Sequence, residues 1–392
     1  MNFERFFHMI PYSKQCIGED DITAVLDVLR SNWLTQGPKV KEFEDSIATY
    51  CGATYAVAFS SGTAALHAAY YVSGVKTGDE VITSPLTFAA TANMIIALGA
   101  KPVFADIDIV SGNLDAREVE KKITKKTKAI VAVDYAGFPV DISAFKKLAK
   151  KYNLVFIEDA AHSLGASYEK KKVGALADMT MFSFHPVKSI TTGEGGMITT
   201  DNELFFEKLL LFRSHGITKD KGKLLRKDKA TWYHEMQDFG FNYRITDIQA
   251  ALGVSQVRKL PLFIKKRQII AHRYQKELKN LKNFIVPKNI SGRTSSWHLF
   301  ALRLIKEKKH LRDVVFAELQ KAGVGVQVHY IPVYRHPYYE SLGYKKGLCP
   351  NAEVFSESEI SIPIFPTLAP EEQGMIIITL KALNEKISDI LM

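Results

Sequence analysis

The residues around Lys188 give the first indication in this sequence of a chemically reactive side chain. It lies in the segment 182–200, FSFHPVKSITTGEGGMITT, between apolar residues and a glycine-rich turn. Lysine is rarely buried, because its ammonium group loses hydration in an apolar environment. The same loss of hydration lowers the pKa of the amine and leaves more of it unprotonated. The segment therefore predicts a nucleophilic amine at position 188.

A candidate phosphate site precedes this lysine in the sequence. In AFSSGTAAL a predicted strand ends at Ser60–Ser61, and a helix begins at Gly62–Thr63. The N-terminus of a helix presents free N–H groups and the positive end of a dipole, which suits a phosphate group. An ordinary capped helix start has the same sequence, so this segment alone does not distinguish the two interpretations.

A candidate carboxylate and a candidate aromatic ring also follow predicted strands. LVFIEDAAHSLGA ends an apolar strand at Glu158–Asp159, where a side chain would point into a ligand crevice. Asp159 is compatible with a buried acid or helix cap, and equally with a carboxylate paired to a protonated pyridine nitrogen. Phe88, in SPLTFAATAN, fits either the core or a stacking position over a ring.

Together these groups match the needs of pyridoxal phosphate. Lys188 would bond to its aldehyde carbon, Asp159 would keep its ring nitrogen protonated, and the helix start would anchor its phosphate. The sequence has no Walker motif and no Gly-x-Gly-x-x-Gly, so nucleoside triphosphate and dinucleotide sites are not indicated. We expect no metal, because His329 and His336 have no third ligand at a suitable spacing.

The elements that must position these residues alternate between strand and helix from about residue 55 to 200. This alternation predicts an α/β fold with a mostly parallel sheet covered on both faces. After about residue 255 a long amphipathic helix, kinked near Pro261, leads into smaller strands and helices. We therefore expect a large cofactor-binding domain over 1–255 and a small C-terminal domain over 256–392. The polar, lysine-rich segment 218–232 is expected to be an excursion from the large domain.

Composition limits the classes of function. The chain has 392 residues, with 52 Lys and Arg against 42 Asp and Glu, a formal charge of +10. The excess is spread along the chain and forms no basic tail, which argues against nucleic acid and allows attraction of an anionic small substrate. Three widely separated cysteines argue against disulfides, and we find no signal peptide and no membrane-spanning stretch. These features predict a cytoplasmic protein.

The order of the motifs resembles the DegT/DnrJ/EryC1 group of sugar aminotransferases, which have the fold type I architecture of aspartate aminotransferase. The resemblance runs from about residue 12 to 390 through LTQGPKVKEFE, SSGTAAL, GDEVITSPLTFAATAN, PVFADID, IEDAAHSLGA, FSFHPVKSITTGEGG, FRSHG and FNYRITDIQAALG. It implies a mostly parallel seven-stranded sheet in the large domain, a smaller C-terminal α/β domain, and a homodimer with shared active sites.

The resemblance also implies roles for cofactor contacts. Lys188 would hold the cofactor covalently, Asp159 would pair with the pyridine nitrogen, and His162 would bond to the phenolic oxygen. Some relatives have Gln at that last position. The other implied contacts are Thr63, Ala64 and Ser183 at the phosphate, Phe88 on the ring, and Asn242 at the phosphate of the neighbouring subunit's cofactor.

Substrate contacts are implied at both ends of the chain. In this family the N-terminal segment that includes Trp33 lines the sugar pocket. The loop 329–339, HYIPVYRHPYY, is rich in rings that could stack on a uracil, although its histidines are equally compatible with structural roles. Arg244 would lie near the substrate or in an interface ion pair. The candidate substrate residues are Tyr12, Thr35, Gln36, Arg244, His329 and Tyr330.

Within the group, VDYAG, FRSHG and VQVHYIPVYRHPYY are most similar to the UDP-sugar aminotransferases of pseudaminic acid biosynthesis. That similarity implies L-glutamate as amino donor and UDP-2-acetamido-2,6-dideoxy-β-L-arabino-hexos-4-ulose as acceptor, giving the 4-amino sugar and 2-oxoglutarate. Another nucleotide-sugar 4-aminotransferase, of the perosamine or 4-amino-arabinose type, is the main alternative. A non-catalytic sensor on the same fold is another. Lys188 argues against the dehydratase branch, which has histidine at that position.

Overall fold

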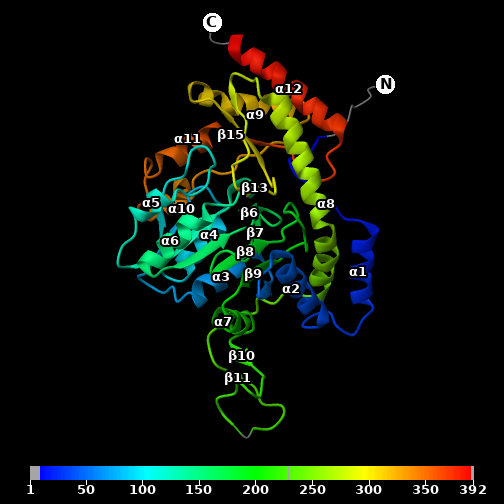
Figure 1. The fold of residues 1–392 in the computed structure, drawn as a ribbon, viewed down its shortest axis with the longest axis vertical. Coiled ribbons are helices and arrows are strands. Elements are labelled where there is room, and N and C mark those ends of the chain that lie inside the picture. Colours follow the sequence, from blue (N-terminus) through cyan, green and yellow to red (C-terminus); the bar gives the residue numbers. More distant parts are fainter. Residues whose placement is uncertain (1–8, 228, 390–392) are drawn as a thin grey trace.

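A seven-stranded sheet forms the centre of the protein, whose computed structural model describes residues 9–227 and 229–389 (Figure 1). The strand order is β1-β9-β8-β5-β4-β2-β3, and β9 runs antiparallel to both of its neighbours while the remaining pairs are parallel. These strands are β1 (Tyr55–Phe59), β2 (Glu80–Thr83), β3 (Lys101–Phe104), β4 (Thr127–Val133), β5 (Val155–Asp159), β8 (Met179–Ser183) and β9 (Gly196–Thr200). The mostly parallel seven-stranded sheet is therefore confirmed.

Helices cover both faces of this sheet, because its strands are apolar on both sides. Along β1, Ala56 and Ala58 enter one core cluster, whereas Val57 and Phe59 enter another, as the alternation of a pleated strand requires. The helices before, between and directly after the large strands are α1 (Glu19–Leu29), α2 (Pro38–Cys51), α3 (Gly62–Val72), α4 (Ala89–Ala97), α5 (Ala116–Glu120), α6 (Ile142–Tyr152) and α7 (Glu203–Arg213), with the short helix η1 (Tyr135–Gly137).

The C-terminal region forms its own core around a three-stranded antiparallel sheet of order β12-β14-β15. Its elements are β12 (Phe284–Ile285), β14 (Phe300–Leu304), β15 (Glu359–Ile362), α9 (Arg312–Lys321), α10 (Pro337–Ser341), α11 (Pro350–Ser358) and α12 (Pro370–Asp389), with the short helices η2 (Lys306–Leu311) and η3 (Val333–Arg335). A further small sheet joins β13 (Arg293–Thr294) to β6 (Ser167–Tyr168) and β7 (Lys171–Lys172).

The long helix α8 (Asp247–Leu278) joins the two regions and runs past both of them in Figure 1. Its first half packs into the core of the large sheet through residues such as Val254, and its second half packs into the C-terminal core through residues such as Tyr274. The helix continues through Pro261. The expected domain boundary between residues 255 and 256 lies inside α8, and it stays a prediction.

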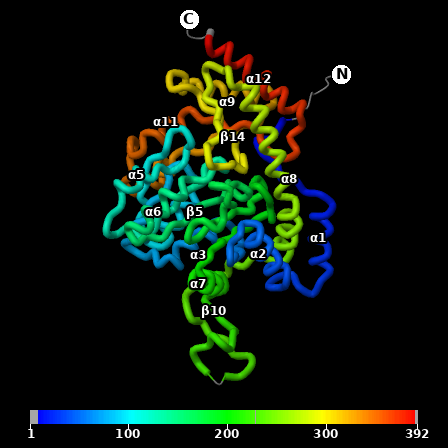
Figure 2. The backbone as a smooth tube through the Cα atoms, in the orientation of Figure 1, coloured from blue at the N-terminus to red at the C-terminus, as the bar shows by residue number. Residues whose placement is uncertain are grey.

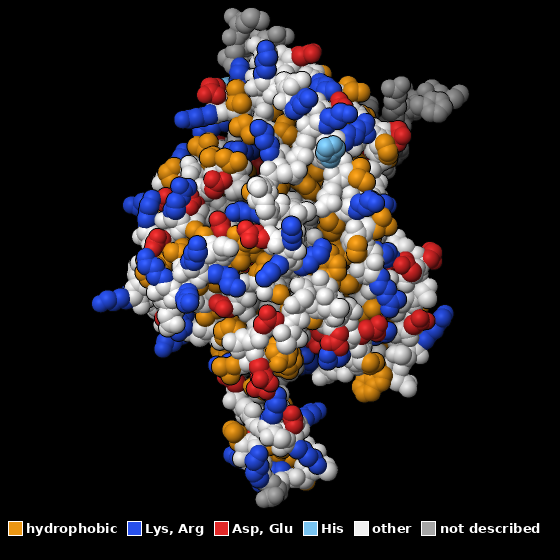
Figure 3. Space-filling model, viewed as in Figure 1, with side chains coloured by type: hydrophobic (Ala, Val, Ile, Leu, Met, Phe, Trp, Pro, Cys, Tyr) orange, Lys and Arg blue, Asp and Glu red, His pale blue; other side chains and the backbone are white. Residues whose placement is uncertain are grey.

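An arm projects from the body after α7. It contains the hairpin β10 (Ile217–Thr218) and β11 (Glu235–Met236), and Figure 2 shows its backbone standing well away from the rest of the chain. The expected excursion 218–232 belongs to this arm, apart from residue 228, which lies outside the described residues. On the face shown in Figure 3, Lys and Arg side chains are mixed with acidic ones over body and arm. Among the helices described, none combines the length and apolarity needed to cross a bilayer.

Candidate active site

Asp159 ends β5 and is buried, as the sequence predicted for a carboxylate at this edge of the sheet. Its Oδ2 accepts a hydrogen bond of 2.7 Å from Thr91 Oγ1, and its Oδ1 accepts one of 3.2 Å from the N–H of Ala161. Burial raises the pKa of Asp159, while these two hydrogen bonds and the charge of Lys188 act in the opposite direction. Its neighbours therefore favour the ionised form that a cationic ring nitrogen would need.

Lys188 lies in the turn that follows β8. The turn is closed by a bond of 2.9 Å from the Lys188 N–H to the carbonyl of His185, and by one of 3.1 Å from the Thr192 N–H to the carbonyl of Phe184. Burial lowers the pKa of Lys188 to about 8, and the negative charge of Asp159 partly opposes this. A substantial fraction of the amine is thus neutral near pH 8, as the apolar setting predicted.

The start of α3 lies against the end of β8. A Cβ built on Gly62 would lie 3.1 Å from Cβ of Ser183, and one on Gly196 would lie 2.4 Å from the carbonyl oxygen of Ser61. Glycine is needed at position 196 for the backbones to approach, and at position 62 it leaves room for the side chain of Ser183. The N–H of Ala64 donates to Ser61 Oγ at 3.1 Å, so an ordinary N-cap is present as well. Thr63 is exposed beside it.

The loop after β5 and the loop 329–339 meet in a group of rings. His162 Nε2 lies 3.1 Å from the hydroxyl of Tyr330. His329 Nδ1 lies 2.9 Å from Ser361 Oγ, and the His329 N–H donates to Glu359 Oε2 at 2.7 Å. The structure thus brings His162, His329 and Tyr330 together, although they are far apart in the sequence.

Both histidines are held neutral near pH 7. Burial and the nearby charge of Lys188 lower the pKa of His162 well below its usual value, and the same causes lower the pKa of His329 to about 3. The ring of Tyr12 lies 5.7 Å from that of His329, which joins the N-terminal segment to this group. We call Asp159, His162, Lys188, His329 and Tyr330 the lysine cluster.

The residues of the lysine cluster, together with Phe88, have the features that bound pyridoxal phosphate would need. His162 Nδ1 is buried and has no hydrogen-bond partner among the described residues, so it can bond to a polar atom of a bound ring. Phe88 caps α4 with 65% of its surface exposed, as a stacking side chain requires and a core side chain does not. Asp159 and Lys188 supply the remaining carboxylate and amine.

A second group of predicted site residues lies at the base of the arm. Gln36 and Arg244 line an open cavity of about 420 Å³ between α2 and α7. Thr35 pairs with Thr246 beside it, and Asn242 is exposed where it pairs with Ser214. Within the described part of the chain, no hydrogen bond or ion pair links this arm-base group to the lysine cluster. Trp33, from the same N-terminal segment, is also exposed.

Some residues of the site were missed by sequence reasoning. Thr87, just before α4, and Thr91, in its first turn, have their hydroxyls 2.7 Å apart, and their places at the predicted start of this helix were an available signal. His298 had no such signal, and its ring lies 4.4 Å from that of His162. Arg267 is fully buried in α8 and donates to the carbonyl of His298 at 3.3 Å and to that of Ile364 at 2.7 Å.

Comparison with known proteins shows relatives over almost the whole chain. The DegT/DnrJ/EryC1/StrS aminotransferase family matches residues 15–381. An uncharacterized protein of Methanocaldococcus jannaschii is 44% identical over 93% of this chain and 94% of its own length. The UDP-4-amino-4,6-dideoxy-N-acetyl-beta-L-altrosamine transaminase of Campylobacter jejuni (strain NCTC 11168) is 40% identical over 97% of this chain and 98% of its own.

Solved structures agree with these relatives. The Helicobacter pylori aminotransferase PseC, involved in the biosynthesis of pseudoaminic acid, superposes with a TM-score of 0.91 at 37% identity, covering 96% of this chain and 100% of its own. The PLP-form of the sugar aminotransferase Spr1654 of Streptococcus pneumoniae has a TM-score of 0.89 at 33% identity, with 97% of this chain and 99% of its own covered. The protein is therefore an enzyme that uses pyridoxal phosphate, and the chain belongs to the DegT/DnrJ/EryC1/StrS aminotransferase family.

Proposed function

We propose that the protein transfers the amino group of L-glutamate to a UDP-linked 4-keto-6-deoxy-N-acetylhexosamine, UDP-2-acetamido-2,6-dideoxy-β-L-arabino-hexos-4-ulose. The products are the 4-amino sugar and 2-oxoglutarate. The observation that carries the chemistry is that Lys188, whose pKa is lowered to about 8, lies close enough to the buried carboxylate of Asp159 for the charge of each group to act on the other. The choice of sugar rests on the resemblance to the Campylobacter jejuni transaminase.

Lys188 is proposed to move the proton. Its Nζ, partly neutral near pH 8, would take a proton from Cα of the amino donor and deliver it to the carbon on the other side of the transferred nitrogen. In the second half-reaction the same atom reverses this transfer at C4 of the sugar. Pyridoxal phosphate, when bound, supplies the electron sink that makes these carbon-bound protons acidic.

The other residues of the lysine cluster are proposed to hold and orient. Asp159 keeps a proton on the ring nitrogen opposite it, and Thr91 fixes the carboxylate for that purpose. Phe88 stacks on one face of the ring, and His162 bonds to the phenolic oxygen while Tyr330 fixes its orientation. Thr63, Ala64 and Ser183 bind the phosphate at the start of α3.

On the sugar side, the proposal places Tyr12, His329 and Tyr330 at the pocket within the same chain. Glu359 and Ser361 hold the neutral His329 from behind, through its backbone N–H and its Nδ1. A buried, neutral imidazole offers hydrogen bonds to hydroxyl groups without repelling a cationic amine. This arrangement therefore suits a substrate with an uncharged, polar sugar ring better than a substrate with a charged side chain.

We also propose a homodimer in which Asn242 of each chain reaches the phosphate of the cofactor held by its partner, beside Thr35, Gln36 and Arg244. The exposure of Asn242, Thr35 and Gln36 supports this arrangement, because a second copy could reach them. The arm exposes Leu225, Trp232, Met236 and Phe239, which a second copy would cover.

The test is a visible absorption titration of the cofactor-loaded protein. L-Glutamate should remove the absorption band of the lysine-bound cofactor, and the UDP-linked N-acetyl sugar of L-arabino configuration should restore it. Restoration only by a dTDP- or GDP-linked 4-keto sugar would move the activity to another nucleotide-sugar aminotransferase. Binding of both substrates with no spectral change would favour a sensor.

A further inference from the structure

A second open cavity, of about 510 Å³, lies beside β3 at the outer edge of the central sheet. This volume is in the range of small-molecule pockets. None of its lining residues belongs to the lysine cluster or to the arm-base group. Its charged lining residues are all lysines, namely Lys101, Lys122, Lys345 and Lys346. We call it the lysine pocket.

The loop that carries two of these lysines is held at both ends. Before them, Gly343 has a φ of 94°, and after them Gly347 has a φ of 88°, so glycine is what allows the turn. The hydroxyl of Tyr344 donates to the carbonyl of Pro102 at 2.5 Å, and the N–H of Gly347 donates to Glu353 Oε1 at 2.6 Å. The turn that presents Lys345 and Lys346 is therefore fixed against the sheet.

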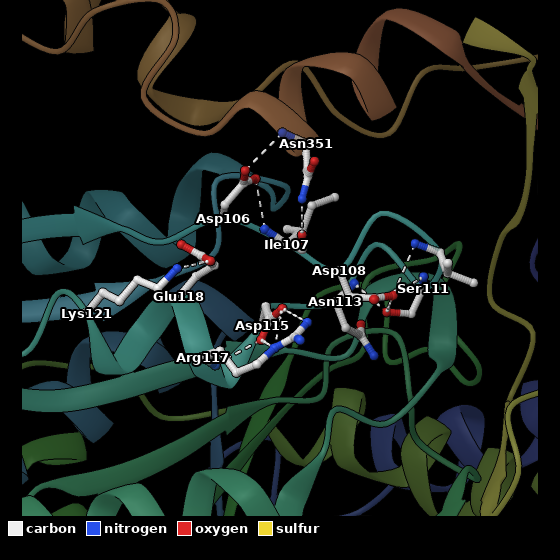
Figure 4. Close-up of polar contacts among 11 residues, drawn as sticks. Asp106, Ile107, Asp108, Ser111, Asn113, Asp115, Arg117, Glu118, Lys121 and Asn351 are labelled. Carbon is white, nitrogen blue, oxygen red and sulfur yellow. Dashed lines mark hydrogen bonds and ion pairs between the residues drawn. The ribbon is translucent and has the colours of Figure 1, made fainter.

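Two acids that lie close in the sequence to pocket residues, Asp106 and Glu118, have other partners. Asp106 accepts hydrogen bonds from the N–H groups of Asn351 at 2.9 Å and Ala352 at 3.0 Å, at the start of α11. Glu118 pairs with Lys121 at 2.6 Å, and Figure 4 shows this pair together with the bond from Asn351 to Asp106. These carboxylates thus have partners other than the pocket lysines.

The four pocket lysines have no ion pair and no side-chain hydrogen bond to any residue that the structure describes. Glu80 lies opposite Lys101 on the neighbouring strand β2, and its carboxylate accepts a hydrogen bond of 2.6 Å from Thr124 Oγ1. The lining of the pocket itself holds four cations and no acid, so its excess of positive charge creates a field that an anionic ligand would relieve.

The occupant is better explained as a small molecule than as a peptide strand. β3 is an edge strand, and an exposed edge can in principle pair with an added strand. Pro102 in this strand has no N–H to donate, and its carbonyl is already bonded to Tyr344. Val103 and Leu348 add a partly exposed apolar surface beside the lysines, which suits a flat organic group.

We propose that the lysine pocket binds a nucleoside diphosphate, either free or within a nucleotide sugar. The phosphates bind to the lysine amines, and the base lies against the apolar surface. This site is separate from the proposed sugar site, and its existence does not depend on the proposed function.

Hydrogen–deuterium exchange of the cofactor-loaded protein tests this proposal, because it reports on the segment 343–348 separately from the rest of the chain. Added UDP at low salt should slow exchange in that segment. The variant Lys345→Ala/Lys346→Ala should need about tenfold more UDP for the same protection, since charge-assisted contacts are lost. The matched control Lys146→Ala/Lys147→Ala removes two exposed lysines from α6 and should behave as wild type. Circular dichroism confirms that both variants fold.

Three results would overturn the proposal. The first is wild-type exchange unchanged by UDP, and the second is full protection in the Lys345→Ala/Lys346→Ala variant. The third is protection by inorganic pyrophosphate or polyglutamate equal to that by UDP, because a base would then play no part. Comparing UDP with a UDP-sugar identifies the source: equal protection shows that the nucleotide is recognised, and stronger protection by the UDP-sugar shows that the sugar is recognised as well.

Discussion

The lysine cluster and the arm-base group contrast sharply in burial and in electrostatics. Asp159 and His162 are buried, and burial shifts the pKa of each. Thr35, Gln36 and Asn242 are exposed, and Arg244 lines an open cavity, where its side chain has no hydrogen bond or ion pair to any residue that the structure describes. The contrast suggests that one chain completes the chemistry of its own cofactor but presents its arm-base group to a second copy. Perturbed groups cluster where reactions occur, which supports this interpretation.

The largest expected effect comes from Lys188→Ala. We expect transamination to fall by about 10⁴-fold or more, because the only proposed group that moves the proton is removed. Stopped-flow absorption with L-glutamate measures this. A control variant, Lys14→Ala, removes an exposed lysine that lies nearby in the fold and should keep its activity. Activity within tenfold of wild type in Lys188→Ala would remove the lysine cluster from the chemistry.

Asp159→Asn should lower the rate by about 10²- to 10³-fold, because the ring nitrogen loses its anionic partner. It should also shift a pH profile. The charge of Asp159 raises the pKa of Lys188, so its removal should move that pKa below about 8. The rate at which apoenzyme captures pyridoxal phosphate, measured against pH, reports the shift. A midpoint that stays fixed or rises would show that the two groups are not coupled.

Asn242→Ala sharpens the comparison, because it tests whether this residue contacts the cofactor of its own chain or that of the partner chain. We expect about tenfold weaker cofactor binding, as for the loss of one phosphate contact. Mixing this variant with Lys188→Ala should give more activity than the sum of the two alone, because a mixed dimer has one site with both native residues. Additive activity in the mixture, with mixed dimers confirmed by mass spectrometry, would place Asn242 at its own chain's site.

A smaller effect, on stability, is expected from Asp134. This residue directly follows β4 and accepts a hydrogen bond of 2.5 Å from Ser163 Oγ. Burial raises the pKa of Asp134 to about 7, and burial together with the charge of Asp134 raises the pKa of its neighbour Glu158, so the two carboxyl groups titrate as a pair. The folded state therefore binds this proton more tightly than the unfolded state, whose pKa is about 4. Its stabilising contribution is complete below pH 4 and is lost as pH rises through 7. The Tm should fall across this interval, and Asp134→Asn should flatten the fall. An unchanged slope in the variant would assign the pH dependence to other groups.

The smallest effect is expected on the exposed side. Asp45 lines the arm-base cavity and pairs with Lys41 on the surface of α2. Exposed pairs contribute little, so Asp45→Asn should change Tm by less than about 1 °C. Differential scanning fluorimetry measures this. A drop in Tm of several degrees would mean that this exposed pair contributes to stability as a buried pair does. The contrast between the arm-base group and the lysine cluster would then fail.

The sequence predicted much of the fold, because alternating apolar strands and capped helices carry local signals. The strands that end at Phe59 and Asp159 were placed within a residue or two, and the low pKa of Lys188 followed from its apolar neighbours. Contacts made across the fold could not be predicted in this way. His298 beside His162 and the carbonyl ligands of Arg267 depend on packing between distant segments. The places of Tyr12 beside His329 and of Thr35 beside Thr246 have the same origin.

The most direct test of the central claim is to find which lysine holds the cofactor. The protein loaded with pyridoxal phosphate is reduced with borohydride, digested, and analysed by mass spectrometry. We predict that the cofactor mass is attached to the peptide that contains Lys188, at about one cofactor for each chain. Attachment to another lysine, or no attachment to the loaded protein, would contradict the assignment of Lys188 and the site built around it.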